Sequence, residues 1–427
     1  MMKNIFDDLS GTFSQKMFQF IRKCFFISLN LSVDILFKPV NLLIRPINNI
    51  SDKFPAPLQR TWYKLHSHYL RFYGFPIGKP LTVDSDKVII FLPQMGWNNM
   101  RQRPHHLPRA FNKAGWTVIF LTQDIDGDKV IGYKEISPGF YICSRVRLLR
   151  KIKNPWIYMN YTVNMFYLRY FKEFRFIYDY VDRLEIHTYY TKKMIKEHYR
   201  SLKIARVVTA TASVLYNEII TIRPDAILVP NAVFPEDFLL TEDTPVPEDM
   251  TEIICQGKPV VGYYGIFSKW KIDYDLILFI AKELPEVNIV LMGPDYDQSL
   301  YKYPWQDYAN IHVLGKKNYW ELPAYANRFD VALLPLLVND VTNTISPVKL
   351  FEYFAMKLPV VSADIEESRK YESVLIAKSH EDFIIQIRKA LRLKTDPAHR
   401  ALVEKDLEQN TWDARCKKIR DRISEIE

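Results

Sequence analysis

Ser346-Pro-Val-Lys-Leu-Phe-Glu-Tyr-Phe-Ala-Met-Lys-Leu-Pro-Val-Val361 joins a predicted helix to a predicted buried strand. Ser346 and Pro347 are typical of a helix start, because proline suits the first helical position. Lys349 and Glu352 are three residues apart, which places both side chains on one face of that helix. A β-branched run follows at once, as expected for a strand of a parallel sheet. The stretch therefore predicts one helix–strand unit of an α/β protein.

The same alternation of short apolar runs and helical stretches continues in both directions from this unit. In this half we expect strands over 259–265, 287–293, 311–315, 331–335 and 359–363, with helices over 272–284, 381–393 and 397–426. An earlier set predicts strands over 87–93, 116–122, 140–143, 174–179, 206–210 and 226–230, and a helix over 104–114 closed by Gly115. Because the alternation of strands and helices occurs in both halves of the chain, it predicts two doubly wound domains. Such domains bind ligands at the carboxyl ends of their strands.

The domain boundaries follow from composition. Residues 241–258 are acidic, contain Pro245 and Pro247 with Pro259 just beyond, and predict a linker. We therefore expect a basic and apolar helical extension over 1–80, a first Rossmann-like domain over 81–240, a second over 241–395 and a closing helix over 396–427.

Charge and cysteine content exclude several classes of protein. The net charge is +9, and the first 80 residues hold 11 Lys or Arg against 4 Asp or Glu. Basic residues there mix with Phe, Leu and Ile, which predicts either a helix on an anionic membrane surface or an extra helical layer on the first domain. The four cysteines are far apart and suggest neither a disulfide nor a zinc site. No nucleic-acid-binding fingerprint and no GxGxxG occur, which disfavours nucleic-acid binding and dinucleotide oxidoreductases.

Five segments in order resemble the GT-B glycosyltransferases of the family 4 type, also called glycosyl transferases group 1, which build bacterial surface polysaccharides. They are Met95–Leu107, Val229-Pro-Asn-Ala-Val233 with Phe238, Gly262-Tyr-Tyr-Gly265 with Trp270 and Asp273, Val290-Leu-Met-Gly-Pro294, and Ser346–Val361. The resemblance covers roughly residues 85–425. It implies an α/β GT-B fold, in which two Rossmann-like domains face each other across a cleft.

The resemblance also implies an activity. A hexosyl-type transferase would move a sugar from a UDP- or GDP-linked donor to a glycan or polyprenyl-linked acceptor, with retention, in cell-surface polysaccharide biosynthesis. The expected location is the cytoplasm, on the inner face of the cell membrane if the extension binds there. No cofactor and no metal are expected, so protein cations and a helix N-terminus would stabilise the leaving diphosphate.

Lys349 and the helix N-terminus would then face the diphosphate, and Glu352 would accept hydrogen bonds from the ribose. An ordinary exposed lysine–glutamate pair is the alternative. Gly265 closes a strand where phosphate can approach the backbone, and Lys269 or Lys271 could supply a second cation.

Other candidates line the expected cleft. In the first domain Asp182 or His187 could polarise the acceptor hydroxyl, and arginines after the first strand suit phosphate contact. The remaining predicted substrate-binding residues are Gly96, Trp97, Arg101, Arg103, Gly293, Tyr319, Asn343, Thr344, Ser346, Pro347 and Leu350. For several of these, core packing or a solvated side chain is the competing interpretation.

Three positions depart from the family pattern. Thr344 stands where retaining members often carry the first glutamate of Glu-x7-Glu, while Ala232 and Leu358 stand where glycine is common. Two alternative functions therefore remain: a nucleotide-sugar isomerase or hydrolase, and a non-catalytic GT-B protein acting as a membrane-associated assembly partner.

Two further motifs are ambiguous. Asp295-Tyr-Asp297 spells a metal-binding Asp-x-Asp, but it follows a predicted Gly293-Pro294 turn, which favours a polar loop. Arg145, Arg147, Arg150, Lys151 and Lys153, followed by Trp156, form a basic stretch that either meets membrane headgroups or is a solvated face.

Overall fold

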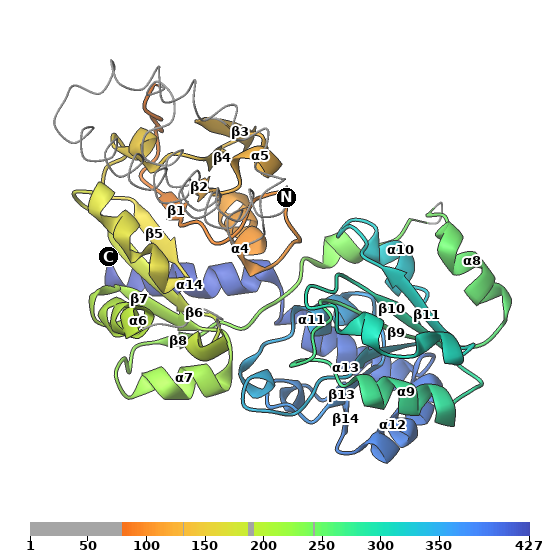
Figure 1. Ribbon diagram of the computed structural model, residues 1–427. Helices are drawn as coiled ribbons and strands as arrows, with labels where there is room; N and C mark the ends of the chain where they lie inside the picture. Colours follow the sequence, from red (N-terminus) through yellow and green to blue (C-terminus); the bar gives the residue numbers. More distant parts are fainter. Residues whose placement is uncertain (1–78, 131, 187–191, 242–243) are drawn as a thin grey trace, which may run out of the picture. The chain divides into compact units, whose positions relative to one another are not determined.

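Figure 1 shows the computed structural model, which describes residues 79–130, 132–186, 192–241 and 244–427. The chain divides into units of residues 1–75 and 76–427, and every element described below belongs to the second unit. The predicted helical extension and the candidate His187 therefore lie outside the described residues, apart from the last two residues of the extension.

The first sheet is built around strands that are buried on both faces. Its order is β3-β4-β2-β1-β5-β6-β7-β8, and only β3, on the edge, runs antiparallel to its neighbour among the pairings described. The strands are β1 (Val88–Phe91), β2 (Thr117–Leu121), β3 (Tyr133–Ser137), β4 (Phe140–Cys143), β5 (Trp156–Met159), β6 (Arg175–Tyr180), β7 (Val207–Ala210) and β8 (Ile227–Leu228).

Different elements cover the two faces of this sheet. Apolar side chains of α4 (Arg103–Lys113) and α14 (Trp412–Ile426) share one core with one set of strand side chains. The other face packs against η2 (Val146–Leu149), η3 (Thr162–Tyr170), α6 (Lys192–Ile204) and α7 (Ser213–Ile220). Short segments α5 (Ile125–Asp128), η4 (Leu184–Ile186) and η5 (Pro235–Phe238) complete this half. The helix nearest the C-terminus thus completes the first core (Figure 1).

The second sheet is parallel throughout its described pairings, with the order β11-β10-β9-β12-β13-β14. This is the strand order of a doubly wound Rossmann-like sheet, as predicted. Its strands are β9 (Val260–Tyr264), β10 (Asn288–Met292), β11 (Ile311–Gly315), β12 (Val331–Leu334), β13 (Val360–Ala363) and β14 (Val374–Ala377). Its helices are α8 (Glu248–Cys255), α9 (Tyr274–Glu283), α10 (Leu322–Ala326), α11 (Val348–Ala355), α12 (His380–Leu393) and α13 (Pro397–Glu408), with 3-10 turns η6 (Leu300–Lys302), η7 (Trp305–Asp307), η8 (Thr342–Thr344) and η9 (Ser368–Lys370).

The structure corrects three of the element predictions. The expected linker over 241–258 contains helix α8, because Met250 and Ile253 are buried in the second core. The predicted closing helix over 397–426 is two helices, since Thr411 caps a new helix at Trp412. Trp156, which we assigned to a basic surface stretch, is fully buried in the central strand β5.

Close packing of α/β layers makes one glycine sensitive to substitution. A Cβ atom on Gly262 in β9 would lie 2.1 Å from the ring of the buried Phe329. We expect Gly262→Ala to lower the free energy of unfolding by about 1–3 kcal/mol, because the overpacked ring must move. Urea denaturation measures this, and Phe329→Leu should recover part of the loss in the double variant. An equal loss in both backgrounds would show that the ring is not the cause.

Candidate functional site

Two glycines end β9 and β10 side by side. A Cβ on Gly293 would lie 1.8 Å from the carbonyl oxygen of Gly265, whose own N–H donates to Met292 at 2.8 Å. A Cβ on Gly265 would lie 2.3 Å from Cε of Lys349. Both glycines have positive φ, +154° and +143°. The missing side chain of Gly265 therefore leaves room for the Lys349 side chain at the end of the sheet, and that of Gly293 leaves room for the backbone of Gly265.

Helix α11 carries Lys349 and Glu352, and its first turn is fixed from outside the helix. Pro347 is the N-cap and makes no side-chain cap bond. The Ser346 hydroxyl, which we expected to cap, instead accepts a hydrogen bond from the Asn231 N–H at 3.1 Å, and the Asn231 amide donates to the Ser346 carbonyl at 2.7 Å. The prediction that Ser346 caps this helix is therefore wrong, because the Ser346 hydroxyl is hydrogen-bonded to Asn231 instead.

Lys271 and Lys349 come together near this helix. Burial, and after it the charge of Lys349, lower the pKa of Lys271 to about 7, and Asp182 partly opposes the shift. Burial also lowers the pKa of Lys349, against the attraction of Glu352. Among the described residues, neither lysine forms an ion pair within 4 Å. Two cations near each other without a bonded carboxylate have the charge that an anion would need in order to bind there.

Each of the two lysines interacts electrostatically with a carboxylate, Lys271 with Asp182 and Lys349 with Glu352. Burial raises the pKa of Asp182 to about 6, against the positive charge of Lys271. Burial also raises the pKa of Glu352, which is 5% exposed, and the opposing influences are Lys349 and a 2.8 Å hydrogen bond donated by the Tyr264 hydroxyl. Tyr264, at the end of β9, thereby orients the Glu352 carboxylate.

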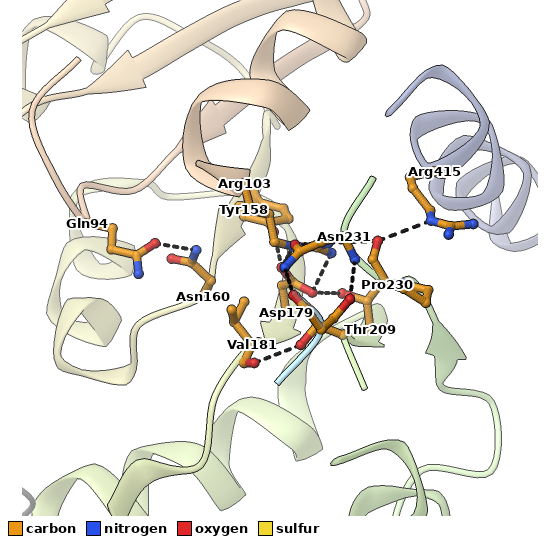
Figure 2. A network of polar contacts seen from close by, with 12 residues as sticks. Gln94, Arg103, Tyr158, Asn160, Asp179, Val181, Thr209, Pro230, Asn231 and Arg415 are labelled. Atoms are coloured by element: carbon orange, nitrogen blue, oxygen red, sulfur yellow. Dashed lines mark hydrogen bonds and ion pairs between the residues drawn. The ribbon is translucent and has the colours of Figure 1, made fainter. Parts of the chain in front are cut away.

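A buried polar network holds the segment that fixes α11 (Figure 2). Arg103 of α4 makes a two-pronged contact with Asp179 of β6, with Nε–Oδ2 at 2.7 Å and Nη2–Oδ1 at 3.0 Å. The hydroxyls of Tyr158 and Thr209 also donate to that carboxylate. Arg103 further donates to the Pro230 carbonyl at 3.3 Å and to Asn231 at 3.4 Å. The network thus links the first sheet to Asn231 and, through it, to Ser346.

The structure separates the predicted arginines by their surroundings. Arg103 is 2% exposed and its guanidinium is engaged by protein groups, which suits a positioning role. The Arg101 guanidinium lies 4.5 Å from the Trp97 ring centroid, and burial lowers its pKa. It makes no hydrogen bond or ion pair within the described parts of the chain, so it is free to meet a ligand.

The loop that carries Gly96 and Trp97 is pinned by a carboxylate. Asp128 accepts hydrogen bonds from the N–H groups of Trp97 at 2.7 Å and Asn98 at 2.8 Å. His105 accepts from the Gln102 N–H and contacts the Gly96 carbonyl at 2.9 Å, and burial lowers its pKa to about 4. The neutral His105 therefore caps α4.

The other candidates occupy several environments. Tyr319 packs edge-to-face on Phe238 at 5.7 Å and donates to Asp237 at 3.0 Å. The buried Thr344 donates to the Val341 carbonyl at 2.7 Å. The Asn343 side chain accepts from the Glu366 N–H at 3.3 Å. Leu350 is fully buried and Lys269 is exposed. The structure thus gathers Lys271, Lys349, Glu352, Asp182 and Gly265, and leaves Lys269 at the surface.

Asp295 and Asp297 cap backbone groups. Asp295 accepts from the N–H groups of Ser299 and Leu300, and Asp297 from those of Lys269 and Ser299. Among the described residues, no group of three or more His, Cys, Asp or Glu could hold a metal ion. Within those residues also, no helix combines the length and apolar character that crossing a bilayer requires.

Sequence reasoning missed Asn231, Tyr264 and Asp179 as functional positions. Asn231 and Tyr264 lie in segments that carried the family resemblance, so their motif membership was a usable signal. Asp179 ends a predicted strand, where a buried charge requires a partner far away in sequence.

Comparisons with known proteins give the family context. Residues 258–392 match the family model described as "Glycosyl transferases group 1". A putative teichuronic acid biosynthesis glycosyltransferase, TuaH from Bacillus subtilis, is 24% identical over 248 residues, which are 54% of this chain and 60% of TuaH. The chain thus spans less than two thirds of that relative's length.

Solved structures show the fold. Sucrose-phosphate synthase from Thermosynechococcus elongatus is 16% identical with a TM-score of 0.60, over 80% of this chain and 99% of that one. HepE from Anabaena, in complex with UDP-glucose, is 12% identical with a TM-score of 0.59, over 79% of this chain and 99% of that one. With the two mainly parallel sheets, these matches confirm the GT-B fold, and the family-model match over residues 258–392 confirms the resemblance to the group 1 glycosyltransferases.

The buried ion pair generates a test of stability. We expect Arg103→Met to lower the free energy of unfolding by about 3–5 kcal/mol, because it leaves the Asp179 carboxylate buried without its cation. Arg147→Met, at an exposed arginine without an ion pair in the described chain, serves as the control and should change it by less than about 0.5 kcal/mol. Urea denaturation followed by tryptophan fluorescence measures both. Similar stability of the two variants would show that the pair is dispensable.

Proposed function

We propose that this GT-B protein, whose residues 258–392 match the group 1 glycosyltransferases, transfers a sugar from a UDP- or GDP-linked donor to a glycan or lipid-linked acceptor. The likeness to a teichuronic acid biosynthesis protein supports a role in cell-surface polysaccharide synthesis. HepE, of the same fold, was solved with UDP-glucose, which supports a nucleotide-sugar donor.

The observation that carries this proposal is the pair of lysines at the end of the second sheet. The charge of Lys349 lowers the pKa of Lys271, burial lowers the pKa of both lysines, and within the described residues neither forms an ion pair. A diphosphate would supply the missing negative charge. As the bond from the sugar to the diphosphate breaks, charge builds on the leaving oxygens, and fixed cations stabilise it more than mobile water does.

Glu352 would bind the nucleoside. Its carboxylate is buried and oriented by Tyr264, and a buried carboxylate seeks hydroxyl donors such as those of a ribose. From one turn of the helix, Lys349 would thus contact the diphosphate and Glu352 the ribose. Retention at the anomeric carbon is part of this proposal and rests on the family match.

Asp182 would lie on the acceptor side. It interacts electrostatically with Lys271, and so it would lie near the proposed diphosphate. A carboxyl whose pKa is raised to about 6 can accept a proton near neutral pH. We propose that it polarises the acceptor hydroxyl. Arg101, whose guanidinium packs on the Trp97 ring and makes no hydrogen bond or ion pair in the described chain, would contact a phosphate of the donor or of the acceptor.

One observation favours a second candidate function. Thr344, where retaining relatives often carry a glutamate, is buried and its hydroxyl is used by the Val341 carbonyl. A non-catalytic assembly partner, or an enzyme acting on the nucleotide sugar alone, would tolerate this. Binding without turnover in the presence of acceptor glycans would favour it.

The first test is nucleotide binding by calorimetry. We expect one of UDP, GDP, ADP or CMP to bind, and Lys349→Ala and Glu352→Ala each to weaken its binding by about 1.5–3 kcal/mol, roughly tenfold or more, because each removes a charge-assisted hydrogen bond. Lys269→Ala, at an exposed lysine near the same strand end, is the matched control. If no nucleotide bound, or if all three variants matched the wild type, the proposed donor site would be wrong.

The low pKa of Lys271 predicts a pH dependence of binding. Above a pKa of about 7 the free protein holds Lys271 increasingly neutral, so a diphosphate must bring the proton back. We expect the Kd for UDP to rise between pH 7.5 and 9 by up to about tenfold per pH unit. Lys271→Arg should remain charged and give a flat profile. A rise of the same size in both proteins would exclude Lys271 as its source.

A further inference from the structure

One stretch of the first half contains no acidic residue. Between Phe140 and Lys172 the sequence has no Asp or Glu, while it holds Arg145, Arg147, Arg150, Lys151, Lys153, Arg169 and Lys172. All of these except the half-buried Arg145 are exposed. They belong to or flank η2 and η3, whose apolar side chains enter the sheet core.

Helix α6 adds a second basic element. Its inner side buries Met194, His198, Ser201 and Leu202. Lys192, Lys196, Tyr199 and Lys203 follow one another at spacings of three or four residues, and all four are exposed. Tyr199 is 50% exposed and Ile204 is 43% exposed. The outer side of α6 therefore combines lysines with an aromatic and an aliphatic side chain, the pattern of a helix that lies on a bilayer.

These elements cover the same face of the first sheet. Leu202 of α6, Leu168 of η3 and Leu149 of η2 lie in one core, opposite the face that carries α4 and α14. Helix α6 contacts η3, and η3 contacts η2. Their exposed basic side chains, Arg147, Arg150, Lys151, Lys153, Arg169, Lys172, Lys192, Lys193, Lys196, Arg200 and Lys203, are called the basic face below.

The basic face is not neutralised by the described protein. Of its members only Arg200 has a carboxylate within 4 Å, Glu197 at 3.6 Å, as far as the described residues extend. Residues 1–80 of the sequence carry an excess of positive charge as well.

We propose that the basic face binds an anionic bilayer surface, with Tyr199 and Ile204 entering the headgroup region. The surface carries clustered positive charge and exposed apolar side chains, as bilayer binding requires. A nucleic acid would match the charge, but it would leave the exposed Ile204 and the 37% exposed Val163 without a partner. The inference deepens the proposed function, because it places a lipid-linked acceptor and the enzyme on one surface.

The test is co-sedimentation of the full chain with vesicles. Phosphatidylcholine vesicles are compared with vesicles that also contain phosphatidylglycerol, in low and high salt. We expect binding to the anionic vesicles only, weakened by salt. Lys192→Glu/Lys196→Glu/Lys203→Glu should reduce the partition coefficient by about a hundredfold, since each basic residue near an anionic surface contributes about tenfold or less.

A matched variant controls for net charge. Lys282→Glu/Lys389→Glu/Arg392→Glu makes the same charge change at exposed residues of α9 and α12, and it should sediment like the wild type. Tyr199→Ala/Ile204→Ala should weaken binding without altering the salt dependence. Equal loss in both charge variants, unchanged binding of the α6 variant, or preference for duplex DNA over vesicles would overturn the proposal.

UDP calorimetry on the same proteins separates the two proposals. An α6 variant that binds UDP normally but loses the vesicles is folded and supports the basic face. Vesicle binding by a wild-type chain that binds no nucleotide would overturn the proposed function while leaving the basic face standing. UDP binding with no vesicle binding would do the reverse.

Discussion

The buried pair of Arg103 and Asp179 is the constraint around which the site is arranged. Taking two charges out of water is tolerated only where each finds its partner and the remaining hydrogen-bonding positions are filled. Tyr158 and Thr209 fill those of the carboxylate, and Asn231 takes part of the guanidinium. The first sheet therefore dictates the position of a segment that in turn holds the start of α11.

The second sheet contributes the opposite kind of electrostatics. Lys271 and Lys349 have no bonded carboxylate in the described chain, and Gly265, which lacks a side chain, leaves space for Lys349. A fully hydrogen-bonded ion pair makes the structure rigid, whereas cations without a bonded carboxylate attract an anionic ligand. The paired charges of Arg103 and Asp179 thus support the candidate site, and the unpaired cations Lys271 and Lys349 lie in it. This is the arrangement expected of a preorganised anion-binding position.

Much of the fold was predictable because parallel strands buried on both faces produce unmistakable apolar runs. Strand β5 was not, since Trp156 follows five basic residues and local charge concealed a buried strand. For the site, helix spacing brought Lys349 and Glu352 together correctly. It could not show that Ser346 bonds to Asn231, more than a hundred residues away, or that Arg103 is matched by Asp179. Long-range partners of polar side chains leave no local pattern to read.

Helix α14 completes the core of the first sheet, although the ribosome synthesises it after every other described element. A ribosome adds roughly 5–20 residues per second, so about ten to forty seconds pass between residue 241 and the emergence of α14. During that interval α4 covers this face of the first sheet without α14, so the core that contains Trp156 of β5 and Phe111 of α4 lacks its second helix. The nascent chain is therefore a natural client for a holdase chaperone, and its yield in a cell should depend on chaperone supply more than its final stability suggests.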